Sequence, residues 1–162
     1  MGNKDKDRMG IAKLIIALVV VLIGGVVFVG AVGGWFDDTK VAISGEYLGD
    51  FEDFQNITAS DYEKLIENKK SFVLLVDQAG CTTADRLREF VEKWAREANI
   101  KIPKIMFSEL KKTSLHENVK YYPSVVVVSQ GKVKVFLRAD SDEDAEEYNK
   151  YETFKEWIDK YV

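Results

Sequence analysis

The most reactive side chain in this sequence is its single cysteine, Cys81. Cys81 directly precedes a strongly helical pattern over residues 82–98, so it should lie at a helix N-terminus. The helix dipole and the free N–H groups there stabilise a thiolate, the nucleophilic form of cysteine. The expected chemistry is the formation of mixed disulfides with other thiols. Two other interpretations stay open: the thiol is the remnant of a degenerate site, or a partly buried apolar side chain.

Other chemistries find little support. His116 is the only histidine, and with one cysteine it leaves too few soft ligands for a structural zinc site. The acidic run Asp140 to Glu147 has calcium-loop spacing at its start, but it lacks the glycine and glutamate of such loops at positions 6 and 12. A net charge of −4 and a pI near 5.2 disfavour nucleic-acid binding. No phosphate-binding glycine loop or acyl-transfer triad is recognisable. We therefore predict no metal and no cofactor, and a solvated loop for the acidic run.

The hydrophobic pattern predicts the elements that would position Cys81. We expect a helix over 60–69, a buried strand over 71–77, a helix over 82–98, a strand over 104–107 and a weak helix around residue 115. A hairpin over 124–129 and 133–138 and a helix from about 151 follow, and residues 41–48 are a candidate short strand. Alternation followed by a hairpin indicates an α/β fold with helices on both faces of a mixed sheet.

This order of elements resembles the thioredoxin family. The matching segments are VLLVDQAGCTTA (73–84), YYPSVVVVSQGKVKVFL (121–137) and TFKEWIDKYV (153–162), and the resemblance covers roughly Phe51 to Val162. It implies a thioredoxin-like mixed sheet with flanking helices. By position, the family's nucleophilic cysteine falls on Cys81 and its cis-proline on Pro123. The residue before that proline, here Tyr122, offers its backbone to an extended substrate in the family. The resemblance thus implies Cys81 as catalytic residue and Tyr122 and Pro123 as substrate-binding residues.

The departures from the family pattern are equally informative. The second cysteine is replaced by Ala84, and the tryptophan before the first cysteine by Gly80. The buried carboxylate of the family falls on Leu75, whereas Asp77 stands nearby at a different strand position. Asp85 replaces a frequent lysine, and its charge is expected to oppose a Cys81 thiolate.

The missing second cysteine limits the chemistry. A dithiol enzyme resolves its mixed disulfide with its own second thiol. Ala84 excludes that cycle, so a monothiol mechanism would need an external thiol or a dithiol redox partner. Whether the chain is an enzyme stays open at this point.

The N-terminal part predicts a membrane anchor. Residues 14–34 (Leu14 to Gly34) contain no charged side chain and would span about 30 Å as a helix, the thickness of a bilayer core. Basic residues at 4, 6, 8 and 13 precede the span, which places the N-terminus in the cytoplasm. A cleaved signal peptide is the alternative, although its apolar region usually has only about 7–15 residues.

The predicted organisation is therefore a cytoplasmic segment (1–13), a transmembrane helix (14–34), a juxtamembrane linker (35–50) and a thioredoxin-like domain (51–162). We expect a single-pass protein of the cell membrane whose C-terminal domain is extracytoplasmic and exchanges disulfides on envelope or secreted proteins. The alternative is a redox-inactive module that binds client proteins or peptides or acts as a chaperone. A homodimer, through a Gly30/Gly34 pair or through Cys81, is a further open alternative.

Overall fold

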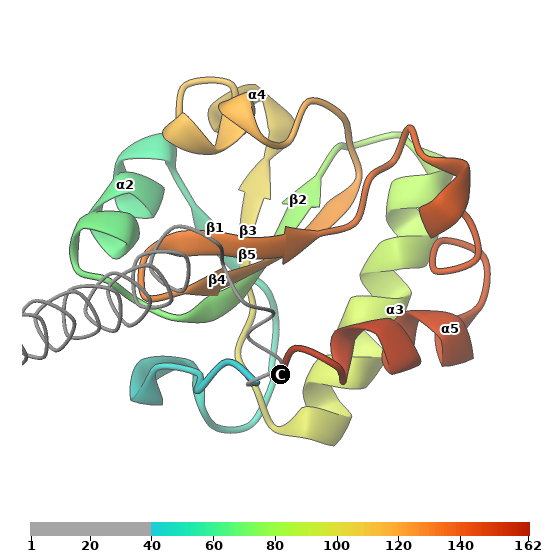
Figure 1. Ribbon diagram of the computed structural model, residues 1–162, viewed down its shortest axis with the longest axis horizontal. Coiled ribbons are helices and arrows are strands. Elements are labelled where there is room, and N and C mark those ends of the chain that lie inside the picture. Colours follow the sequence, from blue (N-terminus) through green and yellow to red (C-terminus); the bar gives the residue numbers. More distant parts are fainter. Residues whose placement is uncertain (1–39) are drawn as a thin grey trace, which may run out of the picture. The chain divides into compact units, whose positions relative to one another are not determined.

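The computed structural model describes residues 40–162. At its centre is a five-stranded sheet in the order β1-β3-β2-β4-β5 (Figure 1). The strands are β1 (Gln55–Ile57), β2 (Phe72–Asp77), β3 (Pro103–Met106), β4 (Ser124–Ser129) and β5 (Lys132–Phe136). β1, β3 and β2 run parallel, whereas β4 is antiparallel to β2 and β5 antiparallel to β4. The sheet is therefore mixed, as the sequence pattern predicted.

Helices cover both faces of this sheet (Figure 1). The α-helices are α2 (Ala59–Glu67), α3 (Thr82–Ala98), α4 (Phe107–Leu110) and α5 (Tyr151–Ile158). Three short 3-10 helices are η1 (Gly45–Tyr47), η2 (Ser114–Glu117) and η3 (Asp142–Asp144). One apolar cluster joins Trp94 of α3 and Phe154 of α5 to Val73 and Leu75 of β2. The second cluster lies on the opposite face, under α2 and α4.

The central strand β2 explains how both clusters form. All its residues from Phe72 to Asp77 are buried, because successive side chains point to opposite faces and helices cover each face. The valine-rich strand β4 pairs with β2 along its length, from Phe72 opposite Val128 to Val76 opposite Ser124. These two buried strands form the centre of the sheet in the described domain.

Several predicted elements are confirmed, with small shifts at their ends. The helix over 82–98 is observed with those bounds, and it ends at Asn99, which adopts a left-handed conformation (φ 57°). The helix predicted from residue 60 begins at Ala59, because Thr58 is its N-cap and forms a reciprocal capping box with Asp61.

The predicted hairpin is also present, and its turn requires glycine. Gln130 and Gly131 both have positive φ (49° and 74°), as in a two-residue type I′ turn. A Cβ atom at Gly131 would lie 2.4 Å from the backbone oxygen of Ile66, so the turn also fits closely against the end of α2.

The segment before residue 51 differs from expectation. Residues 41–48 form η1 and a single bridge between Leu48 and Ile100, instead of a strand. Val41 and Tyr47 are buried, the N–H of Val41 donates to the carbonyl of Tyr161 (2.6 Å), and the N–H of Lys101 donates to that of Tyr47 (2.8 Å). Residues 41–48, predicted as part of the linker, thus pack against residues of the described domain.

The predicted membrane helix, residues 14–34, lies outside the described residues. Between residues 40 and 162, no helix has the length and apolar character needed to cross a bilayer.

Candidate functional site

Cys81 lies where the central strand passes into α3. It is the N-cap residue of α3, its carbonyl accepts the first helical hydrogen bond from the N–H of Asp85 (3.0 Å), and its side chain is half-buried. Gly80 just before it has a φ of 74°, a conformation that glycine adopts without strain. The thiol therefore sits at the carboxyl end of β2, next to the free N–H groups of the first turn of α3.

The segment Tyr122-Pro123 reaches the same end of the sheet. Its peptide bond is cis, as the resemblance implied, and it leads directly into β4. Because Ser124 pairs with Val76 of β2, this loop lies across from the strand end that carries Cys81.

One open groove contains all three residues that the sequence singled out. Cys81, Tyr122 and Pro123 line it, together with Thr83, Ala139, Asp140, Ser141, Asp142, Ala145, Tyr148 and Asn149. The structure thus brings the predicted site residues together. The lining residues that come from the segment 139–149 were not predicted as part of the site.

Tyr122 lines this groove and combines a partly exposed side chain with an unpaired backbone. The side chain is 40% exposed, and its ring packs against Phe107 with the centroids 4.6 Å apart. Within residues 40–162, neither the N–H nor the C=O of Tyr122 makes a hydrogen bond. An edge of free backbone beside the thiol is what an extended peptide needs for pairing.

Tyr148 holds the other side of this loop. Its buried hydroxyl donates to the carbonyl of Pro123 (2.9 Å). Burial, followed by the charges of nearby carboxylates, raises the pKa of Tyr148 well above its usual value, so the hydroxyl stays a donor. Sequence reasoning did not connect Tyr148 with this site, because the two partners of the hydrogen bond are 25 residues apart in the chain.

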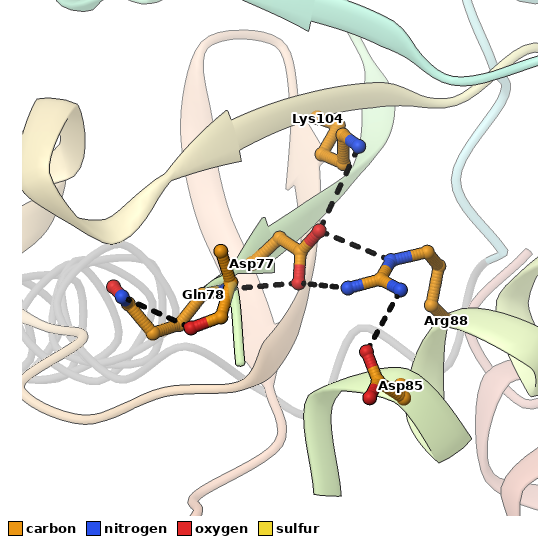
Figure 2. A network of polar contacts seen from close by, with 6 residues as sticks. Asp77, Gln78, Asp85, Arg88 and Lys104 are labelled. Carbon is orange, nitrogen blue, oxygen red and sulfur yellow. Dashed lines mark hydrogen bonds and ion pairs between the residues drawn. The ribbon is translucent and has the colours of Figure 1, made fainter. Parts of the chain in front are cut away.

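A buried ionic network underlies the start of α3 (Figure 2). The carboxylate of Asp77, which is 3% exposed, accepts from Arg88 Nη2 (2.9 Å) and Nε (3.1 Å). It also accepts the N–H of Gln78 (2.8 Å), and Lys104 Nζ lies 3.6 Å away. Arg88 Nη1 donates to Asp85 (3.0 Å).

This network fixes the protonation state of Asp77. Burial alone would raise the pKa of Asp77, but the hydrogen bonds and charge of Arg88, the N–H of Gln78 and the charge of Lys104 outweigh it and lower that pKa. Asp77 is thus ionised at neutral pH, and both its oxygens are engaged by cations. It is therefore poorly suited to exchange protons with a thiol.

The network also changes the expectation for Asp85. The sequence suggested that its charge opposes a Cys81 thiolate, but the carboxylate of Asp85 is paired with Arg88.

Arg88 and Lys104 were missed by sequence reasoning. The spacing of Asp85 and Arg88 on one helix face was the available signal for the first of them. Lys104 needed the register between β2 and β3, which the sequence does not reveal.

The position of the missing second cysteine is occupied by a core residue. Ala84 lies in the first turn of α3 and has no exposed surface. Ala84 is thus fully buried, and no second thiol is available in the sequence to resolve an adduct on Cys81.

Metal ligation finds no support in the described part of the chain. Residues 40–162 contain no group of three or more His, Cys, Asp or Glu side chains arranged to hold an ion.

Comparison with solved structures identifies the fold. A reduced thioredoxin pre-protein of Schistosoma mansoni superposes with a TM-score of 0.52 at 14% identity, covering 70% of this chain and 100% of that one. The thioredoxin of Fasciola hepatica gives 0.51 at 18% identity, covering 67% and 100%. No protein-family model and no curated protein matches the sequence. The described domain therefore has a thioredoxin fold, and identities this low carry the likeness no further than the fold.

Proposed function

We propose that this chain is a membrane-anchored, extracytoplasmic thioredoxin-like protein that exchanges disulfides of envelope or secreted proteins through Cys81. The observation that carries the proposal is the groove that Cys81, at the start of α3, lines together with Tyr122, whose backbone N–H and C=O are unpaired within residues 40–162. A client chain that pairs with this backbone would hold its disulfide beside the sulfur of Cys81.

The proposed reaction begins with the thiolate of Cys81. Its sulfur attacks one sulfur of a client disulfide, an S–S bond forms between Cys81 and the client, and the client's other sulfur leaves as a thiolate. A second thiolate must then attack the mixed disulfide and release Cys81. If that thiolate belongs to the client, the client's disulfides are rearranged without net redox change. If it belongs to an external dithiol partner, a mixed disulfide between client and partner forms as Cys81 leaves. The partner's second thiolate then attacks the partner sulfur of that bond and releases the client thiolate, so the client is reduced and the partner is oxidised to a disulfide. With a monothiol partner, a second molecule makes this last attack.

The N-terminal pattern supports the location. An uncharged stretch over 14–34, with basic residues before it, is typical of an anchor whose N-terminus is cytoplasmic. An anchor in this orientation would put the domain in a compartment where disulfides occur and exchange has substrates.

The test is to trap the mixed disulfide. Membranes that contain the full chain would be treated with acid to quench thiols, and adducts would be separated on non-reducing gels. We expect reducible adducts in the wild type and none in a Cys81→Ser variant. In parallel, iodoacetamide should label Cys81 in the native protein about as fast as in the unfolded one. Labelling only after unfolding, or a Cys81→Ser variant with full activity toward clients, would rule out the exchange reaction.

A redox-inactive client-binding module is the second candidate. The buried Ala84 favours it, because the domain lacks the thiol that would complete a cycle. Under this function the same groove binds clients and Cys81→Ser retains that binding in full. The two candidates thus separate in the trapping experiment.

A further inference from the structure

The groove beside Cys81 carries unbalanced negative charge. Its lining contains Asp140 and Asp142 but no lysine or arginine. Both aspartates are exposed, and neither carboxylate makes an ion pair or hydrogen bond within residues 40–162. The groove therefore has two carboxylates available to a bound molecule.

The neighbouring acidic residues behave differently. Arg138 pairs with Glu143 and Asp144, and Lys150 pairs with Glu146. These three carboxylates, which do not line the groove, are thus paired with cations of the chain, whereas Asp140 and Asp142 are not.

The other features of the groove define the form of the ligand. The unpaired N–H and C=O of Tyr122 suit an extended peptide backbone. Tyr122, a residue that is 40% exposed, adds an aromatic side chain to the lining, and aromatic rings attract cations as well as apolar groups. These observations are independent of the carboxylates, and they point to a peptide rather than a free metal ion.

We infer that the groove selects extended client segments that carry lysine or arginine, and that Asp140 and Asp142 determine this preference. The inference rests on the proposed use of the groove for client binding, under either candidate function, and it does not require the thiol reaction. The carboxylates would contact client side chains while the backbone of Tyr122 pairs with the client main chain.

The test uses the full chain in detergent micelles and two fluorescent, cysteine-free peptides of equal length and apolar content. One peptide carries four lysines and the other four glutamates in the same positions. We expect the lysine peptide to bind more tightly, with an affinity that decreases as salt increases. Removing both charges by Asp140→Asn with Asp142→Asn should weaken its binding about fivefold, as two exposed ion pairs would.

A matched control separates local contact from net charge. Asp50→Asn with Glu52→Gln removes the same charge from exposed residues that do not line the groove. This variant should bind the lysine peptide as the wild type does, and both variants should unfold at the wild-type denaturant concentration.

The outcomes distinguish the inference from the function on which it rests. Equal weakening in the two double variants, or equal affinity for the two peptides, would overturn the role of Asp140 and Asp142 while leaving client binding intact. Failure of both peptides to bind, or peptide binding that Tyr122→Ala leaves unchanged, would instead remove the groove as a client site and the inference with it.

Discussion

At the scale of single residues, the site depends on groups that hold the loop before β4. Cys81 is positioned by its place at the start of α3, whereas Pro123 is positioned through its carbonyl by Tyr148. The hydroxyl of Tyr148 is thus a positioning group, because it contacts the loop and not a reacting atom. A substitution that removes only this hydroxyl oxygen measures its contribution to stability.

Tyr148→Phe should lower the free energy of unfolding by about 1–2 kcal/mol, because it leaves a buried carbonyl without its donor. Denaturant unfolding followed by tryptophan fluorescence measures the change. Tyr161→Phe is the matched control, since the hydroxyl of Tyr161 makes no hydrogen bond within the described domain. A loss equal in both variants would mean that the bond to Pro123 contributes nothing specific.

At the scale of elements, the network around Asp77 joins three parts of the fold. Asp77 ends β2, Lys104 lies on β3, and Arg88 lies on the second turn of α3 (Figure 2). The loop that carries Cys81 runs between two of these parts. We therefore expect the network to fix the angle at which α3 leaves the sheet.

Arg88→Met should lower the free energy of unfolding by about 3 kcal/mol, because it leaves a buried carboxylate with only the more distant Lys104. Arg86→Met on the same helix is the control, since Arg86 makes one hydrogen bond, to Asn149 (2.8 Å), at the surface. The control should lose less than about 1 kcal/mol. Similar losses in both variants would show that the network only offsets the cost of burying its own charges.

Asp77 also predicts a dependence of stability on pH. Its pKa in the folded protein is lowered relative to the unfolded value of about 3.9. The unfolded chain therefore binds the proton first, so the stabilisation is fully present above about pH 5 and is lost as the pH falls through the folded pKa.

Denaturant unfolding of the wild type and of Asp77→Asn between pH 7 and pH 3 tests this. The wild type should lose stability more steeply on acidification than the variant, because only the wild type must protonate Asp77. The variant should still lose some stability, since other carboxyls with lowered pKa, such as Asp159, remain in both. Parallel curves would show that Asp77 does not contribute.

At the scale of the whole molecule, the sequence predicted the features that depend on local pattern and missed those that depend on contacts between distant segments. The bounds of α3 followed from its apolar stripe, and the buried run of β2 from its composition. Cys81, Tyr122 and Pro123 could be placed in one site only through a family resemblance. The pairing of Arg88 with Asp77, and of residues 139–149 with the groove, depends on contacts between distant segments that no local pattern encodes.

The anchor is a prediction at this same scale. Protease added to intact cells should remove the domain, and it should leave a fragment that contains residues 1–34. An epitope tag placed before residue 1 should be protected until the membrane is opened. Protection of the domain in intact cells would contradict the proposed orientation, and release of a soluble domain into the medium would favour the cleaved signal peptide.

The two ends of the described chain meet at one pole of the domain. Lys40 Nζ donates to the carbonyl of Val162 (2.8 Å), and the N–H of Val41 donates to that of Tyr161. Residues 47–49 contact residues 99–101, just after the end of α3. Cys81 lies at the other end of α3, which as a 17-residue helix is about 25 Å long. A sensor chip, a bead or a fusion partner attached to this domain at residue 40 or at residue 162 would therefore be bound at the same pole and leave the groove exposed to solution.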